Sequence, residues 1–452
     1  MQPKGSLDGF RDFYPEDLAR RTLIFRAWRS VARRYSFVEY DGPPLEPLDL
    51  YTAKSGEEIV TQLYNFTDKG GRAVSLRPEM TPTFARMVSA RANALPKPVR
   101  WFSIPQLFRY ERAQRGRKRE HFQLNIDIVG EASELADAEL LAVAVDIMRE
   151  LGLGPDDVRA KVSDRRLLNA LLEAIGVTEA QRGAVYAVLD KIARQPHVVS
   201  REKLEAAGLA PNQVERILAL PDIGSIDDLE RDFGHVDGCK ASIAAFAKYV
   251  AHTHALGIGA WVDLDLSIVR GLAYYTGTVF ELFDARGELR AICGGGRYDH
   301  LLSQLGGVDL PALGFGMGDV VLGELLKERG LFGDAVMDCP DFWVVCAEGA
   351  EPAAVLHAAA CLRRMGYAAE YVLNEEKLRT QKSTAQIKAA ERAGAAWLLI
   401  VRDAAHAEVR PLSRTRGEGP AEGAVIELHD LEDAERGFAA LSEAGVPAPR
   451  ED

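Results

Sequence analysis

Apolar residues recur along this chain with two different spacings, and these spacings predict its helices and strands. Between residues 17 and 35, and again between 133 and 154, they recur every three or four positions, as on one face of a helix. Around 71–77, 99–109 and 121–130 apolar and polar residues alternate, which is typical of strands with one buried face. The first third of the chain is therefore predicted to combine strands with helices.

Capping residues support both predicted helices. Glu16 or Asp17 could cap the first helix, and Ser133 stands where the second needs an N-cap. Gly152 falls where a helix typically stops. We therefore expect an amphipathic helix that follows Ser133 and ends near Gly152.

The middle of the chain has a different pattern. From about 164 to 256 the spacing is almost entirely helical, and strands return at 261–269, 277–284 and 289–294. The run LGFGMGDVVLGELLKERG then passes from a glycine-rich strand end into a helix. This layout predicts an α+β fold, with an antiparallel sheet interrupted by a helical insertion.

The last quarter of the chain reads as a separate unit. Residues 328–341 have the composition of a linker, and the segments beyond them alternate as β-α-β-α-β. This pattern predicts a small α/β domain with a mixed or parallel sheet over 342–452. A larger domain would occupy 1–330.

Composition narrows the functional classes. The 452 residues suffice for two or three domains, and the net charge of −12 argues against nucleic-acid binding over the whole surface. A local basic groove remains compatible with that charge. No apolar run is long enough to span a membrane and the start lacks an apolar signal core, so a soluble cytoplasmic protein is expected.

Cysteine and histidine spacing gives no support for a metal site. The five cysteines form no CxxC pair, and the nine histidines contain no HExxH spacing. Reduced structural thiols are therefore expected, and no resident metal is predicted.

The densest chemical signal is the stretch FRYERAQRGRKREHFQLNID at 108–127. From Arg109 to Glu120 it carries six basic and two acidic residues, and the flanking alternation predicts a hairpin with a basic loop. Arginine binds phosphate oxygens in a bidentate manner, so the loop is interpreted as a site for a nucleotide or an RNA end. A solvated loop without a ligand is the alternative.

Two further stretches have weaker signals. In LRPEMTPTFARM, Glu79 and Thr81 would face the same side of a strand, where a carboxylate and a hydroxyl could hold an amino group. A surface turn at Pro78 is the competing interpretation. The glycines of LGFGMGD at 313–319 are spaced G-x-G-x-G, which is not a dinucleotide fingerprint. They would instead let a flat ring lie close to a strand.

Taken together, these segments resemble the histidyl-tRNA synthetase family of class II aminoacyl-tRNA synthetases over nearly the whole chain. The stretch GFRDFYPED resembles the family's N-terminal signature, and FRYERAQRGRKREHFQ resembles its motif 2. YDGPPLEPLDLY resembles motif 1, with Pro43 at a dimer interface. The stretches VRGLAYY and GGGRYD resemble the two histidine-specific signatures. The resemblance implies a class II catalytic domain followed by an anticodon-binding domain.

The resemblance also implies roles for the motif residues. Histidine would be bound by Glu79, Thr81, Gln123, Asp127, Tyr274 and Tyr275. ATP would be bound by Arg109, Glu111, Arg117, His121 and Arg270, with Arg109 and Arg270 as catalytic residues. Transfer RNA would be contacted by Arg115, Lys118, Arg119, Lys377, Arg379 and Lys382.

Two of these roles have a clear chemical reason. Arg270 would reach the α-phosphate of ATP and stabilise charge as the histidine carboxylate attacks. Tyr275 and Asp127 would each bind one imidazole nitrogen, a pattern that few other amino acids satisfy. The glycines at 294–296 would leave room for the ring.

The sequence departs from the family pattern at several positions. Val321 stands where motif 3 has an arginine for the γ-phosphate, and Ala273 replaces an acid. Asp127 is one methylene shorter than the usual glutamate, and His121 takes the adenine-stacking position. The C-terminal domain also lacks the usual glycine-glutamate after its strand, reading LIVRDAAHAEVRPL. Without a motif 3 arginine, the predicted cations for the terminal phosphates are Arg117, preferred because it matches a family position, and Arg119, helped by Mg²⁺.

The implied activity is that of a homodimeric histidine–tRNA ligase, which uses ATP to join L-histidine to tRNA(His). The alternative is a non-catalytic paralogue, such as the histidine-sensing regulatory subunit of ATP phosphoribosyltransferase. Val321 favours that alternative, whereas Arg270, the motif 2 cluster and the C-terminal domain favour the ligase. A tRNA-sensing module without chemistry is a third interpretation, and the absence of a fused effector domain weighs against it.

Overall fold

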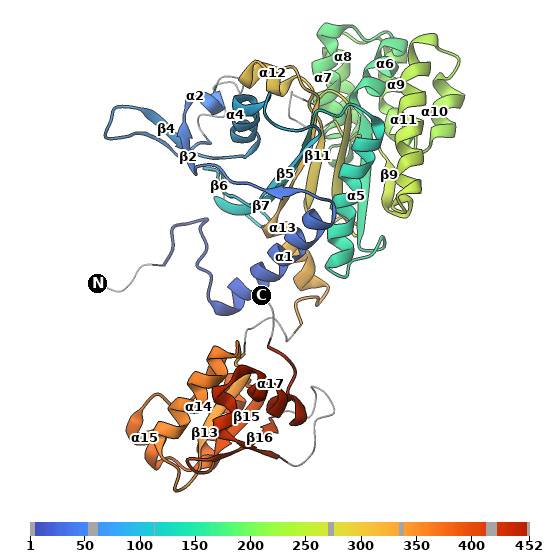
Figure 1. The fold of residues 1–452 in the computed structure, drawn as a ribbon. Coiled ribbons are helices and arrows are strands. Elements are labelled where there is room, and N and C mark those ends of the chain that lie inside the picture. The colour runs from blue at the N-terminus through green and yellow to red at the C-terminus, as the bar shows by residue number, and fades with distance from the viewer. Residues whose placement is uncertain are drawn as a thin grey trace. The chain divides into compact units, whose positions relative to one another are not determined.

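The structure is a computed structural model that describes residues 5–52, 62–112, 114–269, 275–333, 339–412 and 423–449. The chain divides into two compact units, Met1–Val336 and Met337–Asp452. Each unit contains a sheet with helices packed on it, as the ribbon of Figure 1 shows. The predicted mixture of helices and strands, with a separate C-terminal sheet domain, is confirmed.

A large sheet forms the centre of the first unit. Its inner strands are antiparallel, and the pairs β1–β5 and β8–β9 at its two edges are parallel. In the described part of the chain it has nine strands. In spatial order they are β1 (Val38–Glu39), β5 (Val99–Ser103), β7 (Glu120–Val129), β12 (Ala312–Gly318), β11 (Cys293–Arg297), β10 (Thr278–Asp284), β8 (Val158–Asp164) and β9 (Val262–Leu264), with β6 (Gln106–Phe108) paired to β7.

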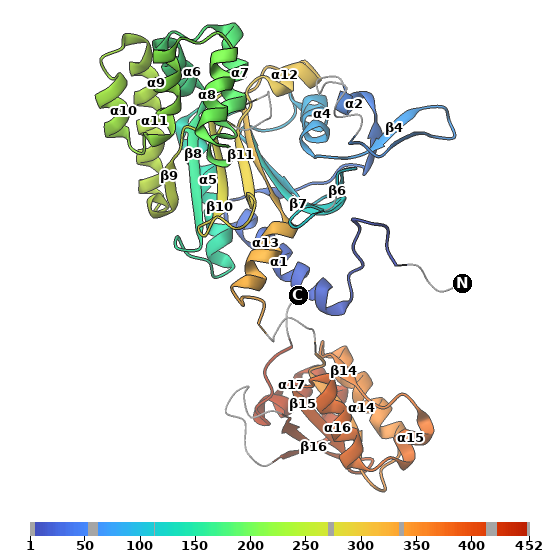
Figure 2. The ribbon, with the colours of Figure 1, turned by 180° about the vertical axis from the view of Figure 1, so that it is seen from behind.

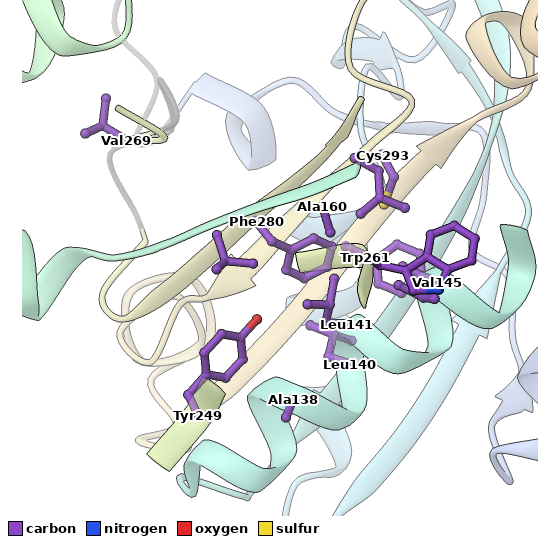
Figure 3. Close-up of a cluster of buried hydrophobic side chains, with 14 of the residues drawn as sticks. Ala138, Leu140, Leu141, Val145, Ala160, Tyr249, Trp261, Val269, Phe280 and Cys293 are labelled. Carbon is purple, nitrogen blue, oxygen red and sulfur yellow. The ribbon is translucent and has the colours of Figure 1, made fainter. Parts of the chain in front are cut away.

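Helix α5 (Glu134–Glu150) packs its apolar face against this sheet. Leu140, Leu141 and Val145 are buried against Phe280 of β10 and its neighbours, as Figure 3 shows. Ser133 is the N-cap as predicted, although its side chain makes no capping hydrogen bond. The 3.6-residue apolar period of the sequence thus corresponds to one buried helix face.

Helices α1 (Pro15–Arg34) and α13 (Asp319–Glu328) pack beside each other on the same unit. The N-cap of α1 is Tyr14, because Pro15 occupies the first helical position, where its missing N–H costs no hydrogen bond. Glu16 and Asp17 therefore lie in the first turn, and the expectation that one of them caps the helix is wrong.

The insertion is helical, as predicted, and follows directly after β8. Figures 1 and 2 show its helices gathered at one end of the large sheet. Asp164 at the end of β8 caps the first of them by accepting bonds from the backbone N–H groups of Arg166 and Leu167, at 2.8 and 3.0 Å. The helices are α6 (Arg165–Ile175), α7 (Glu179–Leu189), α8 (His197–Ala206), α9 (Pro211–Leu218), α10 (Ile226–Phe233) and α11 (Asp237–Ala255).

Among its described residues, the first unit also contains a smaller sheet and three further α-helices. Strand β4 (Ala73–Leu76) lies between β2 (Leu45–Pro47) and β3 (Asn65–Thr67). The short helices are α2 (Asp49–Thr52), α4 (Thr81–Arg91) and α12 (Leu301–Gly306). Arg77, which is 4% exposed, follows β4 and donates bonds to Asp41 and to the carbonyls of Gly42 and Gln106, at 2.7 to 3.1 Å. It thereby joins the small sheet to β6.

One predicted strand has the wrong bounds. The strand expected at 289–294 is β11, Cys293–Arg297, and most of 285–290 is an exposed connection from β10. A side chain at Gly295 would collide with Phe315 on β12. The close approach of the neighbouring strand therefore needs the glycines inside the strand, where apolar alternation gives no signal.

The second unit has a mixed sheet in the order β14 (Ala369–Glu370), β13 (Phe342–Cys346), β15 (Trp397–Val401), β16 (His406–Pro411) and β17 (Ala424–Glu427). The first three strands are parallel and the last two are antiparallel. The helices are α14 (Pro352–Arg364), α15 (Glu375–Thr380), α16 (Ser383–Ala393) and α17 (Ala434–Glu443). Helix α16 corresponds to the second helix of the predicted β-α-β-α-β pattern. None of the helices described in either unit is long and apolar enough to cross a bilayer.

Candidate active site

A cleft of about 1170 Å³ lies over the large sheet. Its walls come from β7, β10, β11 and β12, the connection between β6 and β7, the start of α13, and the insertion. Six of the predicted site residues line it, namely Arg109, Glu111, Arg117, Lys118, His121 and Gln123. The structure thus brings most of the predicted nucleotide ligands to one concave surface.

Strand β7 positions the polar side chains of the floor. Because side chains alternate along a strand, His121, Gln123 and Asp127 share one face. Leu124 and Ile126 point to the opposite face and are fully buried in the core. The apolar core therefore fixes the direction of the polar residues.

Two glycines of β12 make room for these polar side chains. A Cβ atom at Gly314 would collide with the carboxylate of Asp127, its direct partner across the sheet. A Cβ at Gly316 would lie 2.8 to 3.0 Å from the side-chain amide of Gln123. The G-x-G-x-G spacing thus accommodates two predicted histidine ligands, whereas the sequence indicated space for a ring.

In the second glycine run, at 294–296, two of the three glycines also lie close to protein atoms. Gly294 lines the cleft. A side chain at Gly296, in contrast, would meet the ring of Tyr275 at 3.0 Å as well as backbone of β10. Of the three glycines expected to leave room for the imidazole, Gly295 and Gly296 are instead packed against protein atoms.

Asp127 is held by a residue that the sequence analysis did not single out. The hydroxyl of Tyr298 donates a hydrogen bond to Oδ1 of Asp127, and both side chains are buried. Burial raises the pKa of Asp127 to about 7, and the bond from Tyr298 partly opposes this. Tyr275 is also buried, in the same apolar cluster as Tyr298. Tyr298 is the tyrosine of the GGGRYD stretch, so the resemblance of that stretch to a family signature could have indicated this partner of Asp127.

Glu79 and Thr81 have a different local structure from the one expected. Glu79 lies in a turn and Thr81 is the first residue of α4, so the two do not share a strand face. Pro78 is buried, and its carbonyl accepts a bond from Nε of Arg109 at 2.9 Å, so the surface-turn alternative is also wrong. Burial raises the pKa of Glu79, and the nearby Arg109 partly opposes this effect.

The arginines of the β6–β7 connection have separate partners. Arg117 pairs with Glu111 at 2.7 Å, and both line the cleft. Arg115 pairs with Glu324 of α13 at 3.1 Å and with Glu328. These contacts hold the basic loop against α13.

Arg119 faces the N-terminal segment. Its guanidinium lies 3.5 Å from the carboxylate of Asp8 and donates to the backbone carbonyls of Asp8 and Glu111 at 3.2 and 3.1 Å. Its side chain also packs under Gly9, where a Cβ would meet it at 2.7 Å. It is not among the residues that line the cleft, unlike Lys118. Arg119 is therefore poorly placed for the terminal phosphates.

Arg11 joins three elements around the cleft, and the sequence analysis gave it no role. Its guanidinium lies 2.6 Å from Glu120 of β7 and 2.9 Å from Asp319 of α13. Asp319 also accepts a bond from the backbone N–H of Phe122 at 2.9 Å. Both carboxylates are almost fully buried, and burial raises the pKa of Asp319 while Arg11 partly opposes this. Arg11 is the arginine of the N-terminal stretch GFRDFYPED, and the resemblance of that stretch to a family signature could have indicated its importance.

Comparison with known proteins identifies the family. The family model described as Histidyl-tRNA synthetase matches residues 9–318, which is more than half of the chain. The chain belongs to the histidyl-tRNA synthetase family.

Curated relatives in this family have ligase names. The "Histidine--tRNA ligase" of Opitutus terrae is 46% identical over 375 residues, covering 82% of this chain and 85% of the relative. The "Histidine--tRNA ligase, chloroplastic/mitochondrial" of Arabidopsis thaliana is 42% identical, covering 83% and 76%. These names favour a ligase over the regulatory paralogue.

Solved structures show the same fold. A histidyl-tRNA synthetase from Nostoc sp. PCC 7120 has a TM-score of 0.79 at 22% identity, covering 97% of this chain and 100% of that one. A protein from Bacillus halodurans described as "ATP phosphoribosyltransferase regulatory subunit/histidyl-tRNA synthetase" has a TM-score of 0.69 at 24% identity, covering 81% and 92%. At these identities the likeness supports the family fold alone.

Several predicted family residues need separate mention. Arg270, Ala273 and Tyr274 lie outside the described residues. Val321 lies in the first turn of α13, is 8% exposed and lines the cleft, so this position contributes apolar surface. Burial, with Arg109 and Arg11 nearby, lowers the pKa of His121 to about 3, which keeps its ring neutral.

The predicted tRNA-contacting residues of the second unit are exposed. Lys377 and Arg379 lie on α15, and Lys382 is the N-cap of α16. Arg379 lies 3.5 Å from Glu375, one helical turn away, in an exposed pair that contributes little to stability. These cations remain accessible to a partner.

Proposed function

We propose that the protein is a histidine–tRNA ligase that activates L-histidine with ATP and transfers it to the 3′ end of tRNA(His). The observation that carries this proposal is the polar face of β7. There Gln123 and Asp127 stand beside the basic cleft, and Gly314 and Gly316 leave space for them. The ligase names of the relatives support the same activity.

The first step would join histidine to AMP. The histidine carboxylate attacks the α-phosphorus of ATP, a new P–O bond forms, and the bond to the β-phosphate breaks to release pyrophosphate. Arg109 and Arg270 would neutralise the charge that develops on the α-phosphate. In the second step a ribose hydroxyl of the tRNA 3′ end attacks the histidyl carbonyl carbon, and AMP leaves.

Substrate selection would rest on Asp127 and the tyrosines. An ionised Asp127 accepts a hydrogen bond from one imidazole N–H, and Tyr275 would bind the other nitrogen. Glu79 and Gln123 would bind the α-amino group, together with Thr81. A site with buried polar groups rejects a ligand that leaves them unpaired, so isosteric amino acids should be discriminated strongly.

ATP would enter with Mg²⁺. The described residues contain no group of three His, Cys, Asp or Glu side chains that could hold a metal by themselves. Mg²⁺ usually needs one or two carboxylates besides the phosphates, and the cleft offers Glu111 and Glu281, so its side chains fit an ion that arrives with ATP. The ion would supply positive charge to the phosphates.

We also propose a homodimer joined near Pro43. Pro43 is exposed, and strand β1 forms an edge of the large sheet. Two apolar side chains that such an interface could cover are exposed: Val38 on β1 is 61% exposed and Phe66 on the small sheet is 52% exposed. Sedimentation at micromolar concentration should give a dimer, and a monomer there would contradict this proposal.

The second unit would bind the anticodon region of the tRNA through α15 and α16.

The cellular compartment would be the cytoplasm, because the five cysteines are free, as in a reducing environment.

Histidine-dependent ATP–pyrophosphate exchange tests the activity directly. Exchange with histidine, followed by charging of tRNA(His), is expected of the ligase. Histidine binding without exchange would indicate the regulatory paralogue instead. Arg270→Ala should lower the exchange rate by about 10²- to 10³-fold, as for other preorganised charge-stabilising donors.

A further inference from the structure

Arg290 is a cation of the cleft that none of the sequence motifs singled out. It lies on the connection between β10 and β11, is exposed and lines the cleft. With the residues that the structure describes, its side chain makes no hydrogen bond or ion pair. Its charge is therefore available to a ligand.

Three of the other cations that line the cleft are already paired with carboxylates. Arg117 has Glu111 at 2.7 Å, and Lys161 has Asp265 at 2.9 Å. Arg159 is bound to Asp263. Lys118 and Arg194 resemble Arg290 in making no ion pair with the described residues, so position must distinguish the three.

Arg290 lies beside Gly116, at the tip of the basic loop. A Cβ atom built on Gly116 would lie 3.8 Å from Cδ of Arg290 and 3.5 Å from Cγ2 of Val321. Gly116 has φ +71° and no side chain of its own, so the loop backbone lies close to these two residues. The stem of Arg290, the loop that carries Arg117, and the first turn of α13 therefore meet at one point of the cleft wall.

That point needs a net positive charge if it receives phosphates. Val321 contributes none, and the charge of Arg117 is balanced by Glu111. Asp319, at the start of α13, adds a carboxylate that shares Arg11 with Glu120. Arg290 is a side chain at this meeting point whose charge no described residue compensates.

We propose that Arg290 binds the terminal phosphates of ATP and stabilises the departing pyrophosphate during histidine activation. The inference rests on the proposed ligase function. A guanidinium can donate two parallel hydrogen bonds to phosphate oxygens, and its long stem can fold over the nucleotide. Arg290 and Arg117 would then hold the pyrophosphate from two sides of Gly116.

The test compares Arg290→Ala with Arg286→Ala, an exposed arginine of the same connection that does not line the cleft. In the exchange assay, Arg290→Ala should lower kcat/KM for ATP by about 10- to 100-fold, the usual effect of losing a charge-assisted contact. The KM for inorganic pyrophosphate in the same assay should rise by a similar factor. The KM for histidine, and transfer from preformed histidyl-adenylate to tRNA, should stay unchanged.

Two further variants separate charge from structure. Arg290→Lys should recover part of the lost kcat/KM, and Val321→Arg added to Arg290→Ala should also recover part. Arg286→Ala should stay within about twofold of wild type by the same principle, since it lies away from the phosphates.

The outcomes are distinguishable from failure of the ligase proposal. A wild-type protein without histidine-dependent exchange would contradict the proposed function itself. An active wild type in which Arg290→Ala behaves like Arg286→Ala would overturn the role of Arg290. A loss confined to the histidine KM would overturn it as well.

Discussion

The hydroxyl of Tyr298 donates a hydrogen bond to the carboxylate of Asp127 inside the first unit. The tyrosine belongs to the connection after β11 and the aspartate to β7, so two distant stretches of the chain meet at this predicted histidine ligand. Because burial raises the pKa of Asp127 to about 7, this carboxyl titrates within the physiological range. Histidine recognition should therefore depend on pH.

Asp127→Asn is expected to remove that dependence. Above pH 7 the wild-type carboxylate is ionised and accepts the imidazole N–H, so the variant should lose about 10- to 150-fold in kcat/KM for histidine. As pH falls to 6, the ionised fraction drops about tenfold and the difference between the enzymes should shrink accordingly. The ratio of the two enzymes at each pH cancels the titration of free histidine.

Tyr298→Phe provides the control for this assignment. The bond from Tyr298 favours the ionised carboxylate, so its loss should move the midpoint of the profile above pH 7. Folding stability gives an independent readout. Since the native pKa exceeds the ordinary one of 3.8, wild-type stability should fall as pH rises from about 4 to 7, and Asp127→Asn should not show this fall. A profile that both variants leave unchanged would contradict the role of Asp127.

Gly314→Ala should damage the histidine site through a single methyl group. The added Cβ would collide with the Asp127 carboxylate and would also lie 2.7 Å from the carbonyl oxygen of Ile126. We expect a destabilisation of about 1–3 kcal/mol and a higher KM for histidine, measured by thermal unfolding and exchange. Gly318→Ala is the matched control, because a Cβ there meets no atom within 4 Å. Equal effects of the two substitutions would be incompatible with this explanation.

The sequence predicted those features that depend on local periodicity. Helix α5 and strand β7 have regular apolar spacing, and their bounds, Glu134–Glu150 and Glu120–Val129, lie close to the predicted ones. The motif residues on β7 could also be located, since strand alternation alone places His121, Gln123 and Asp127 on one face. Their roles toward histidine and ATP stay predictions.

Features that depend on contacts between distant segments could not be predicted. Strand β11 was placed too early because glycines carry no apolar signal, while its true position depends on Phe315 of the next strand. Arg119 was the second candidate for the terminal phosphates, after Arg117, and the structure places it against Asp8 of the N-terminal segment. Arg290 was overlooked because only the folded chain brings it to Gly116. The chemistry of a side chain is visible in sequence, whereas its neighbours are set by the fold.

Arg11→Ala should leave two buried carboxylates, Glu120 and Asp319, without their shared cation. Removing one partner of a buried ion pair typically costs about 3–5 kcal/mol, so a clear drop of the thermal midpoint is expected. The loss should grow as pH rises, because the pKa of Asp319 is already raised and would rise further without Arg11. Adding Asp319→Asn should restore part of the stability.

Arg20→Ala is the matched control for Arg11→Ala. Arg20 pairs with Asp17 at 3.1 Å, with 45% and 53% of the two side chains exposed. An exposed pair is worth about 0–1 kcal/mol, so this variant should unfold close to wild type. If both variants unfold alike, Arg11 does not join the N-terminal segment to β7 and α13 in the way described.

The second unit allows a test that separates tRNA binding from amino-acid activation. Lys377, Arg379 and Lys382 are exposed on α15 and at the start of α16, in a domain with its own hydrophobic core. Replacing all three by alanine should therefore leave that core and the cleft of the first unit intact. We expect unchanged histidine-dependent exchange but a higher KM for tRNA(His), with a weaker salt dependence because fewer phosphate contacts release counterions.

The matched control replaces Lys240 and Arg231 of the insertion, which are exposed but paired with carboxylates. A triple variant with normal charging at several salt concentrations would show that these cations do not meet the tRNA. A parallel loss of exchange and charging would instead indicate that the second unit supports the catalytic one structurally.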